Sequence, residues 1–135
     1  MDLKEIIYPG MTLETTFIVR EQHMAPHLGS GDLRVLSTPS MIAFMENTSH
    51  RLLAQHLPEG YSSVGTHVDV HHLAATPLGS SVRVKTEVTQ VDGIRVQFNI
   101  EAWDEKEQIG SGLHERAVID HARFMRRVAA KSSTS

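Results

Sequence analysis

The longest stretch with a helical pattern of apolar positions runs over residues 38–57. Apolar and small side chains recur there every three to four residues, which predicts an α-helix with one broad buried surface. Ser37 and Thr38 offer capping hydroxyls, and Pro39 fits the first helical position, where a missing N–H costs nothing. Residues 58–60, a Pro-Glu-Gly sequence, end the helix. The positions that form the apolar stripe are Met41, Ile42, Phe44, Met45, Thr48, Ser49, Leu52, Leu53 and His56.

Most of the remaining chain alternates between apolar and polar positions, as β-strands with one buried face do. The ranges predicted as strands are 13–20, 61–73, 81–91, 94–103 and 108–121. Asp92-Gly93 lies between the third and fourth of these strands and is a strong signal for a two-residue hairpin. Residues 21–33 contain one proline and two glycines, so we expect an irregular loop of the kind that forms lids or binding loops.

One strand, a loop, a long apolar helix and then four strands in succession indicate an α+β architecture with an antiparallel sheet. A strongly twisted sheet that curls around the helix would bury that helix on most sides. Such an arrangement resembles the hotdog fold, in which an antiparallel sheet is wrapped around one long central helix. We expect a single domain of this kind over residues 1–135, with a frayed tail from about residue 128.

The predicted strand over residues 61–73 carries an H-x-D-x-H pattern, formed by His67, Asp69 and His71. Alternate strand positions are roughly 6.5–7 Å apart, which makes three ligands on one strand a poor metal cage. We therefore predict no metal site, and we assign this face to solvent or to a dimer contact. Strict alternation also puts Gly65 on the face of His67, Asp69 and His71. It puts His72 on the opposite face, unless a bulge intervenes.

Composition narrows the class of protein. The 135 residues are 40% hydrophobic and 21% charged, with a net charge of −3, so nothing points to a nucleic-acid partner. The chain has no cysteine, which excludes disulfides, cysteine nucleophiles and thiolate metal sites. No apolar run is long enough for a membrane span, and the N-terminus lacks a signal-peptide pattern. We expect a cytoplasmic protein that does not bind membranes.

Glu46 is the most conspicuous polar residue of the predicted helix, because a carboxylate within a broad apolar surface needs a partner or must line a polar site. Thr38 precedes it by eight residues, about 12 Å along the axis and roughly 80° away in rotation. The two side chains would meet at one pocket only through a group from elsewhere, for which His72 is a candidate. Each residue also has a purely structural interpretation: a helix cap, a paired carboxylate and a strand-end histidine.

Two segments resemble the fluoroacetyl-CoA thioesterase family of the hotdog thioesterase superfamily: S-T-P-S-M-I-A-F-M-E-N and S-S-V-G-T-H-V-D-V-H-H-L-A-A-T-P-L-G. In that family a threonine at the helix start, a glutamate within the helix and a histidine after a G-T-x-V-x-V-x-H strand form the catalytic group. Thr38, Glu46 and His72 match these by type and spacing, and Gly65 matches the strand glycine. The resemblance implies an acyl-CoA hydrolase that needs no cofactor beyond the coenzyme A of its substrate. It also implies a homodimer or tetramer with active sites between subunits.

Two further segments bear on the substrate. Arg116 in the last strand would bind a carboxylate or the phosphates of coenzyme A if it points inward, and is otherwise a solvated strand arginine. Residues 22–33 contain no Phe, Tyr or Trp, whereas the defining member of the family has an aromatic-rich lid there. We therefore expect a small or medium acyl group other than fluoroacetyl.

These residue types suit thioester cleavage. A histidine moves protons near neutral pH, a carboxylate attacks the carbonyl carbon or orients water, and a threonine hydroxyl donates to the carbonyl or relays a proton. Backbone N–H groups at the helix start or near Gly65 would stabilise an oxyanion. The sequence leaves a covalent intermediate and direct hydrolysis equally open.

Other functions fit the same pattern. A non-catalytic acyl-CoA-binding module would keep the pocket but would need neither Glu46 nor His72. A hotdog acyl-CoA hydratase or dehydratase typically carries a D-x-N-x-x-H string, which does not occur here. A structural dimer without activity is a third alternative.

Overall fold

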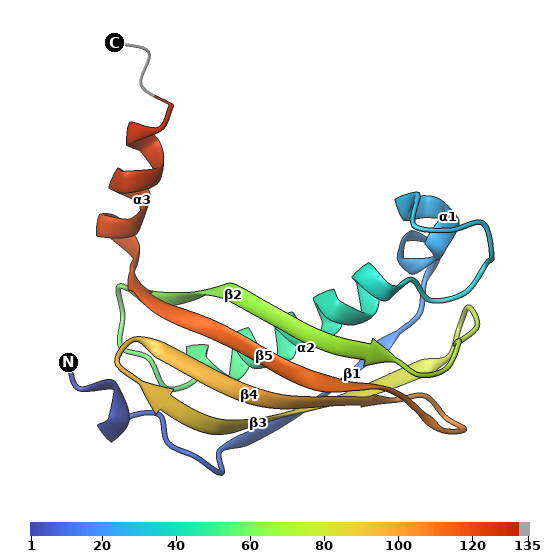
Figure 1. Ribbon diagram of the computed structural model, residues 1–135, viewed down its shortest axis with the longest axis horizontal. Helices are drawn as coiled ribbons and strands as arrows, with labels where there is room; N and C mark the ends of the chain where they lie inside the picture. The colour runs from blue at the N-terminus through green and yellow to red at the C-terminus, as the bar shows by residue number, and fades with distance from the viewer. Residues whose placement is uncertain (133–135) are drawn as a thin grey trace.

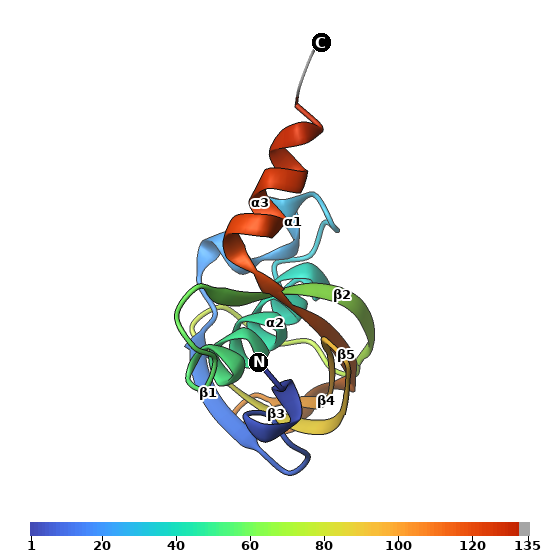
Figure 2. The same cartoon turned by 90° about the vertical axis from the view of Figure 1, so that its left-hand side faces the viewer.

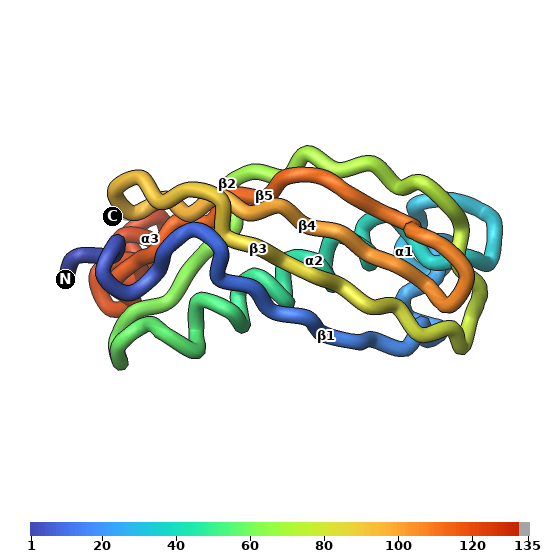
Figure 3. The backbone as a smooth tube through the Cα atoms, turned by 90° about the horizontal axis from the view of Figure 1, so that it is seen from below, coloured from blue at the N-terminus to red at the C-terminus, as the bar shows by residue number. Residues whose placement is uncertain are grey.

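The computed structural model describes residues 1–132; residues 133–135, the end of the predicted tail, lie outside it. One antiparallel sheet has the strand order β1-β3-β4-β5-β2 (Figure 3). It curves around helix α2 (Thr38–Ala54), which lies along its concave side (Figures 1 and 2). This arrangement confirms the predicted α+β hotdog architecture. The strands are β1 (Thr12–Ile18), β2 (Tyr61–His72), β3 (Ser81–Asp92), β4 (Arg95–Trp103) and β5 (Gln108–Asp120).

Helix α2 begins as its sequence predicts, with one difference that matters for the site. The hydroxyl of Ser37 accepts a hydrogen bond from the Ser40 backbone N–H at 3.1 Å, so Ser37 is the N-cap. Thr38 is the first helical residue, and its hydroxyl is free to bind another partner. The helix ends at Ala54, three residues earlier than predicted, although the Leu57 N–H still donates to the Leu53 carbonyl.

The core lies between the apolar face of α2 and the concave face of the sheet. Side chains such as Met41, Met45 and Phe98 are fully buried there, and each contributes roughly 1.5–3 kcal/mol by leaving water. Gly110 in β5 permits the close approach, because a Cβ at that position would lie 2.6 Å from the Met41 sulfur. The buried hydroxyls of this region are satisfied within the core; the Ser49 and Thr86 oxygens, for example, are 2.8 Å apart.

The loop predicted over residues 21–33 contains two short helices, η2 (Glu21–His23) and α1 (Ala25–Leu28). A third one-turn helix, η1 (Leu3–Glu5), lies near the N-terminus. The Ala25 N–H donates to the Val35 carbonyl at 3.0 Å, which ties the loop to the segment that leads into α2. The loop is therefore a folded flap beside the start of α2 (Figure 1).

Helix α3 (His121–Ala130) was not predicted and projects away from the sheet (Figure 1). The Asp120 side chain caps it by accepting from the Arg123 N–H at 3.1 Å. No residue of α3 is buried, and apolar side chains such as Met125 and Val128 are exposed. The segment was too short for its sequence alone to predict a helix. Residues 128–130, placed in the frayed tail by the sequence, belong to this helix.

Strand β2 contains a bulge that changes which residues face α2. Gly65 pairs with Arg116 and His67 with Glu115, so Thr66 is the extra residue on β2. The Thr66 hydroxyl is 2.8 Å from the Glu115 carboxylate, to which it donates, and 3.2 Å from the Glu115 carbonyl oxygen, so the bulge is anchored on β5. Gly65 and His72 consequently share the inner face, despite their odd spacing. The bulge lies before His67 and not beside His72, so His72 is on the opposite face from His71, as alternation predicts. The outward placement of Gly65 by strict alternation is wrong.

Among residues 1–132, no helix is both long enough and apolar enough to cross a membrane.

Candidate active site

The end of β2 meets the start of α2 at a hydrogen bond between Thr38 and His72. The Thr38 Oγ1 and His72 Nδ1 atoms are 2.8 Å apart. The other ring nitrogen of His72, Nε2, is buried and has no hydrogen-bond partner within residues 1–132. Burial lowers the pKa of His72 below its ordinary value, opposed only in part by the backbone of Ala74. The imidazole is therefore neutral at pH 7 and able to accept a proton.

This pair lines a cavity of about 560 Å³ between the start of α2, the folded loop and the segment after β2. Its walls are largely small or apolar, so it suits a compact, mainly apolar group near the Thr38–His72 pair. Besides this pair, the walls include Ala25, Leu33, Val35 and Ala74.

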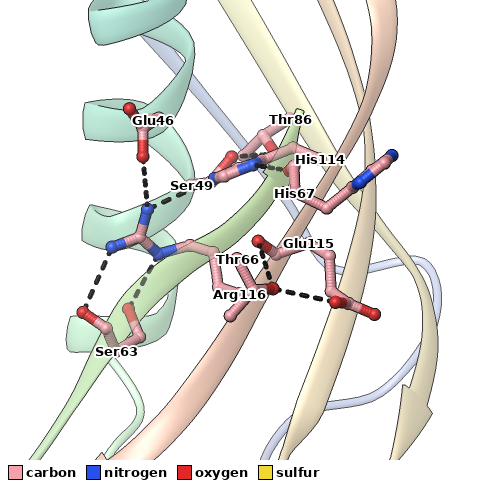
Figure 4. A network of polar contacts seen from close by, with 9 residues as sticks. All are labelled: Glu46, Ser49, Ser63, Thr66, His67, Thr86, His114, Glu115 and Arg116. Atoms are coloured by element: carbon pink, nitrogen blue, oxygen red, sulfur yellow. Dashed lines mark hydrogen bonds and ion pairs between the residues drawn. The ribbon is translucent and has the colours of Figure 1, made fainter. Parts of the chain in front are cut away.

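A second polar group lies where β5 passes the middle of α2 (Figure 4). The Arg116 Nη1 atom is 3.5 Å from the Glu46 Oε2 atom. Only 7% of the Arg116 side chain is exposed, against 42% of the Glu46 side chain, so the arginine is the fixed partner. Arg116 Nε donates to the Ser63 hydroxyl at 2.9 Å, and Nη2 donates to the Ser63 carbonyl at 3.1 Å. Burial lowers the pKa of Arg116, and the negative charge of Glu46 opposes this shift. The guanidinium nevertheless stays charged at neutral pH.

Gly65 is the β2 residue beside this carboxylate, and only a glycine leaves room for it. A Cβ at position 65 would collide with Glu46 Oε2 and would lie 3.5 Å from Arg116 Nη1. The close approach depends on the bulge at Thr66, which keeps Gly65 on the inner face of the strand.

The five residues predicted for the site thus form two groups within one chain: Thr38 with His72, and Glu46 with Gly65 and Arg116. No hydrogen bond or ion pair links the two groups within residues 1–132. They are about 12 Å apart along α2, from eight residues at 1.5 Å each. Arg116 points inward and contacts protein groups, which excludes its interpretation as a solvated strand arginine.

Sequence reasoning missed two members of the second group, Ser63 and His114. His114 Nε2 is 3.2 Å from Arg116 Nη1, and its Nδ1 is 2.8 Å from the His67 carbonyl oxygen. The spacing of His114 and Arg116 in β5 was a usable signal, because residues two apart on a strand share a face.

The H-x-D-x-H residues lie on the opposite face of β2. His67, Asp69 and His71 are all exposed, which agrees with their assignment to an outer surface. In the part of the chain that the structure describes, no three metal-ligating side chains gather closely enough to hold a metal ion.

Comparison with known proteins places this chain among thioesterases. Residues 19–122 match the model of the family described as fluoroacetyl-CoA-specific thioesterase. The fluoroacetyl-CoA thioesterase of Streptantibioticus cattleyicolor is 41% identical over 98 residues, which cover 73% of this chain and 70% of that protein.

Solved structures agree with this assignment. A structure of the fluoroacetyl-CoA thioesterase FlK has a TM-score of 0.88 and 34% identity, covering 93% of this chain and 97% of that chain. A hot-dog-like protein from Thermanaerovibrio acidaminovorans has a TM-score of 0.91 and 27% identity, with both chains covered completely. Together with the family match, these similarities show that the chain belongs to the fluoroacetyl-CoA-specific thioesterase family, as its sequence motifs predict.

Proposed function

We propose that this protein hydrolyses acyl-CoA thioesters to the free acid and coenzyme A, with Thr38, Glu46 and His72 as its catalytic residues. The observation that carries the proposal is the 2.8 Å contact between Thr38 Oγ1 and His72 Nδ1 at the wall of a cavity. Family membership supports the reaction class, and mutants of FlK have been solved in complexes with fluoroacetate and CoA and with acetyl-CoA.

In the reaction, an oxygen derived from water bonds to the acyl carbon, the C–S bond breaks and the leaving sulfur takes a proton. Neutral His72 is suited to accept a proton from the Thr38 hydroxyl or from water and to return it to the sulfur. The Glu46 carboxylate is accessible to attack the carbonyl carbon or to orient water. Both a covalent intermediate and direct hydrolysis are compatible with these roles.

Gly65 and Arg116 are assigned to substrate binding and oxyanion stabilisation. Arg116 presents a fixed positive charge beside the Glu46 carboxylate, in a position to attract a developing negative charge. Gly65 keeps the backbone of β2 close to the same point, since a side chain there would displace the carboxylate.

A homodimer would bring the two polar groups together. Strand β2 is an edge of the sheet, so the 12 residues of its outer edge are free to pair with another strand. Antiparallel pairing of two β2 strands about a two-fold axis would carry Thr38 and His72 of one protomer toward Glu46 and Gly65 of the other. We propose this dimer, which also allows a tetramer, as the active form.

The acyl group is proposed to be small or medium and not fluoroacetyl. The cavity has compact apolar walls, and residues 22–33 contain no aromatic side chain that would cover a fluorinated carbon. No cofactor beyond the coenzyme A of the substrate is invoked. The cytoplasmic location stays a prediction.

The test is thiol release from a panel of acyl-CoA esters, from short to long and including aryl and fluoroacetyl esters. Wild type would turn over at least one ester, and Glu46→Gln and His72→Ala would each lower kcat/KM by about a thousandfold. Matched controls are Glu59→Gln and His56→Ala, which change exposed residues of the same types outside β2 and leave activity intact.

The outcomes separate the candidate functions. Turnover that survives both site variants would show that the residue assignment is wrong. Saturable acyl-CoA binding without thiol release from any ester would favour a binding module. Loss of an enoyl-CoA absorbance without thiol release would favour a hydratase.

A further inference from the structure

We propose that His114 is a positioning residue, which holds the Arg116 guanidinium against Glu46 by acting as a neutral hydrogen-bond acceptor. The proposal rests on two contacts to the imidazole and on the burial of the pair, which are 1% and 6% exposed. It deepens the proposed function of the same site and depends on that function for its activity measurements.

The partners of His114 determine which ring nitrogen carries the proton. Its Nδ1 is 2.8 Å from the His67 carbonyl oxygen, which can only accept a hydrogen bond. Its Nε2 is 3.2 Å from Arg116 Nη1, which can only donate. Nδ1 therefore carries the hydrogen and Nε2 is bare. A protonated ring would lose the acceptor and place a second positive charge against Arg116.

The surroundings favour this neutral form. Burial lowers the pKa of His114, and the positive charge of Arg116 lowers it further. From α2, the Glu46 carboxylate opposes this shift, as does the hydrogen bond to the His67 carbonyl. The His67 side chain on β2 lowers the pKa of His114 slightly further. On β4, the Phe98 ring stacks on the imidazole, with 6.0 Å between the two ring centroids.

His114 also completes the set of contacts that fixes the guanidinium. Ser63 accepts hydrogen bonds from Nε and Nη2, which lie on the side of the guanidinium away from Glu46. His114 binds Nη1, the same nitrogen that faces the Glu46 carboxylate (Figure 4). Without this acceptor, the guanidinium would rotate about its Ser63 contacts, and the contact between Arg116 Nη1 and Glu46 Oε2 would weaken. The bulge at Thr66 contributes as well, because the carbonyl that orients the imidazole belongs to the next residue.

Two amide variants separate the two nitrogen positions of the ring. Asn at position 114 has its polar atoms near the place of Nδ1 and offers Arg116 no acceptor, whereas Gln reaches the place of Nε2. We expect His114→Asn to lower kcat about tenfold with little change in KM, and His114→Gln to lose less than threefold. The control is His56→Asn, an exposed histidine beyond the end of α2. Equal losses in the Asn and Gln variants would overturn the proposal.

A double-mutant cycle tests whether His114 acts through Arg116. In an Arg116→Lys background, His114→Asn should lower kcat by less than a further twofold, because the guanidinium that His114 orients is absent. Losses that multiply fully would show that His114 acts independently, and the proposal would fall. Melting temperatures of all four proteins would separate this coupling from a shared loss of folding.

The protonation state gives a measurement that does not require activity. In ¹⁵N spectra of the histidine rings at pH 7, the resonances absent from His114→Gln belong to His114. They should show a protonated Nδ1 and a bare Nε2, and the opposite tautomer or a charged ring would refute the proposal. A wild type without thioesterase activity would refute the proposed function and leave this result to decide the role of His114.

Discussion

The two polar groups along α2 are built in opposite ways. In the Thr38–His72 pair, the threonine is exposed, a cavity adjoins the pair and one ring nitrogen has no partner within residues 1–132. In the group around Arg116, the guanidinium is buried and all three of its nitrogens contact protein groups. An atom left without a partner is available to exchange protons, whereas a saturated group holds a charge in place. The first group is therefore suited to proton transfer and the second to electrostatic stabilisation.

Gly65→Ala tests the saturated group and should have the largest effect of the variants considered next. The new Cβ would displace the flexible carboxylate of Glu46, so kcat/KM should fall about a hundredfold while the melting temperature hardly changes. Gly110→Ala is the matched comparison, because its Cβ would press on Met41 in the core and cost about 1–3 kcal/mol of stability. Steady-state kinetics and thermal unfolding distinguish the two. An inactive Gly65→Ala protein that also melts far lower would contradict this expectation.

Substitutions at Thr38 test the open pair. Thr38→Ala removes the hydroxyl that contacts His72 and should lower kcat/KM about thirtyfold, whereas Thr38→Ser keeps the hydroxyl and should lose less than threefold. Helix capping should be unaffected in both variants, because Ser37 is the N-cap. Steady-state kinetics on the preferred ester measures both losses. If Thr38→Ala and wild type had the same activity, the hydroxyl would have no role beyond structure.

The pH dependence should show the smallest effect. Burial lowers the pKa of His72 below 6.5, so the neutral ring persists under mildly acidic conditions and kcat/KM at pH 6.5 should be within twofold of its value at pH 7.5. A profile that is half-maximal at pH 6.5 or above would contradict this. His114 is the other histidine of the site whose pKa is lowered. In the His114→Gln variant, the fall of kcat/KM at acidic pH should therefore remain, because His72 controls it.

The free energy of unfolding should also depend on the lowered pKa values of these histidines. Because the pKa of His72 and of His114 is lower in the folded protein, protons bind more tightly to the unfolded chain. The free energy of unfolding should therefore be insensitive to these groups above pH 6.5 and should decline below it. Urea unfolding at several pH values measures this decline, and stability that rises on acidification below pH 6.5 would contradict the assignment.

The sequence predicted much of this arrangement for physical reasons that can be named. The helix over α2 was recognised from its apolar period, its capping serine and the proline near its start. The hairpin at Asp92-Gly93 was recognised from its turn residues. Family motifs singled out Thr38, Glu46 and His72 as candidate catalytic residues, of which the structure joins Thr38 to His72.

The remainder depends on contacts between distant parts of the chain. Ser63 and Arg116 are 53 residues apart, and they meet only because β2 pairs with β5 in one register. Nothing in the local pattern of either strand specifies that register. For His114, the sequence offered only its spacing of two residues from Arg116, and its contact with the His67 carbonyl depends on the same register. Helix α3 was missed because it is only 10 residues long and none of its residues is buried in this chain, so no packing partner could be inferred for it.

The bulge at Thr66 bears on how insertions and deletions are accommodated. Residues are usually gained or lost in loops, since a change of one residue inside a strand reverses every side chain beyond it. Thr66 is an exception, because it is the bulged residue of β2 and has no partner on β5. A chain that lacked it would keep its ladder, and both Gly65 and His72 would still face the helix. In alignments of relatives, a one-residue gap in the middle of this strand is therefore physically reasonable, and the number of residues between the glycine and the histidine is a poor criterion for membership.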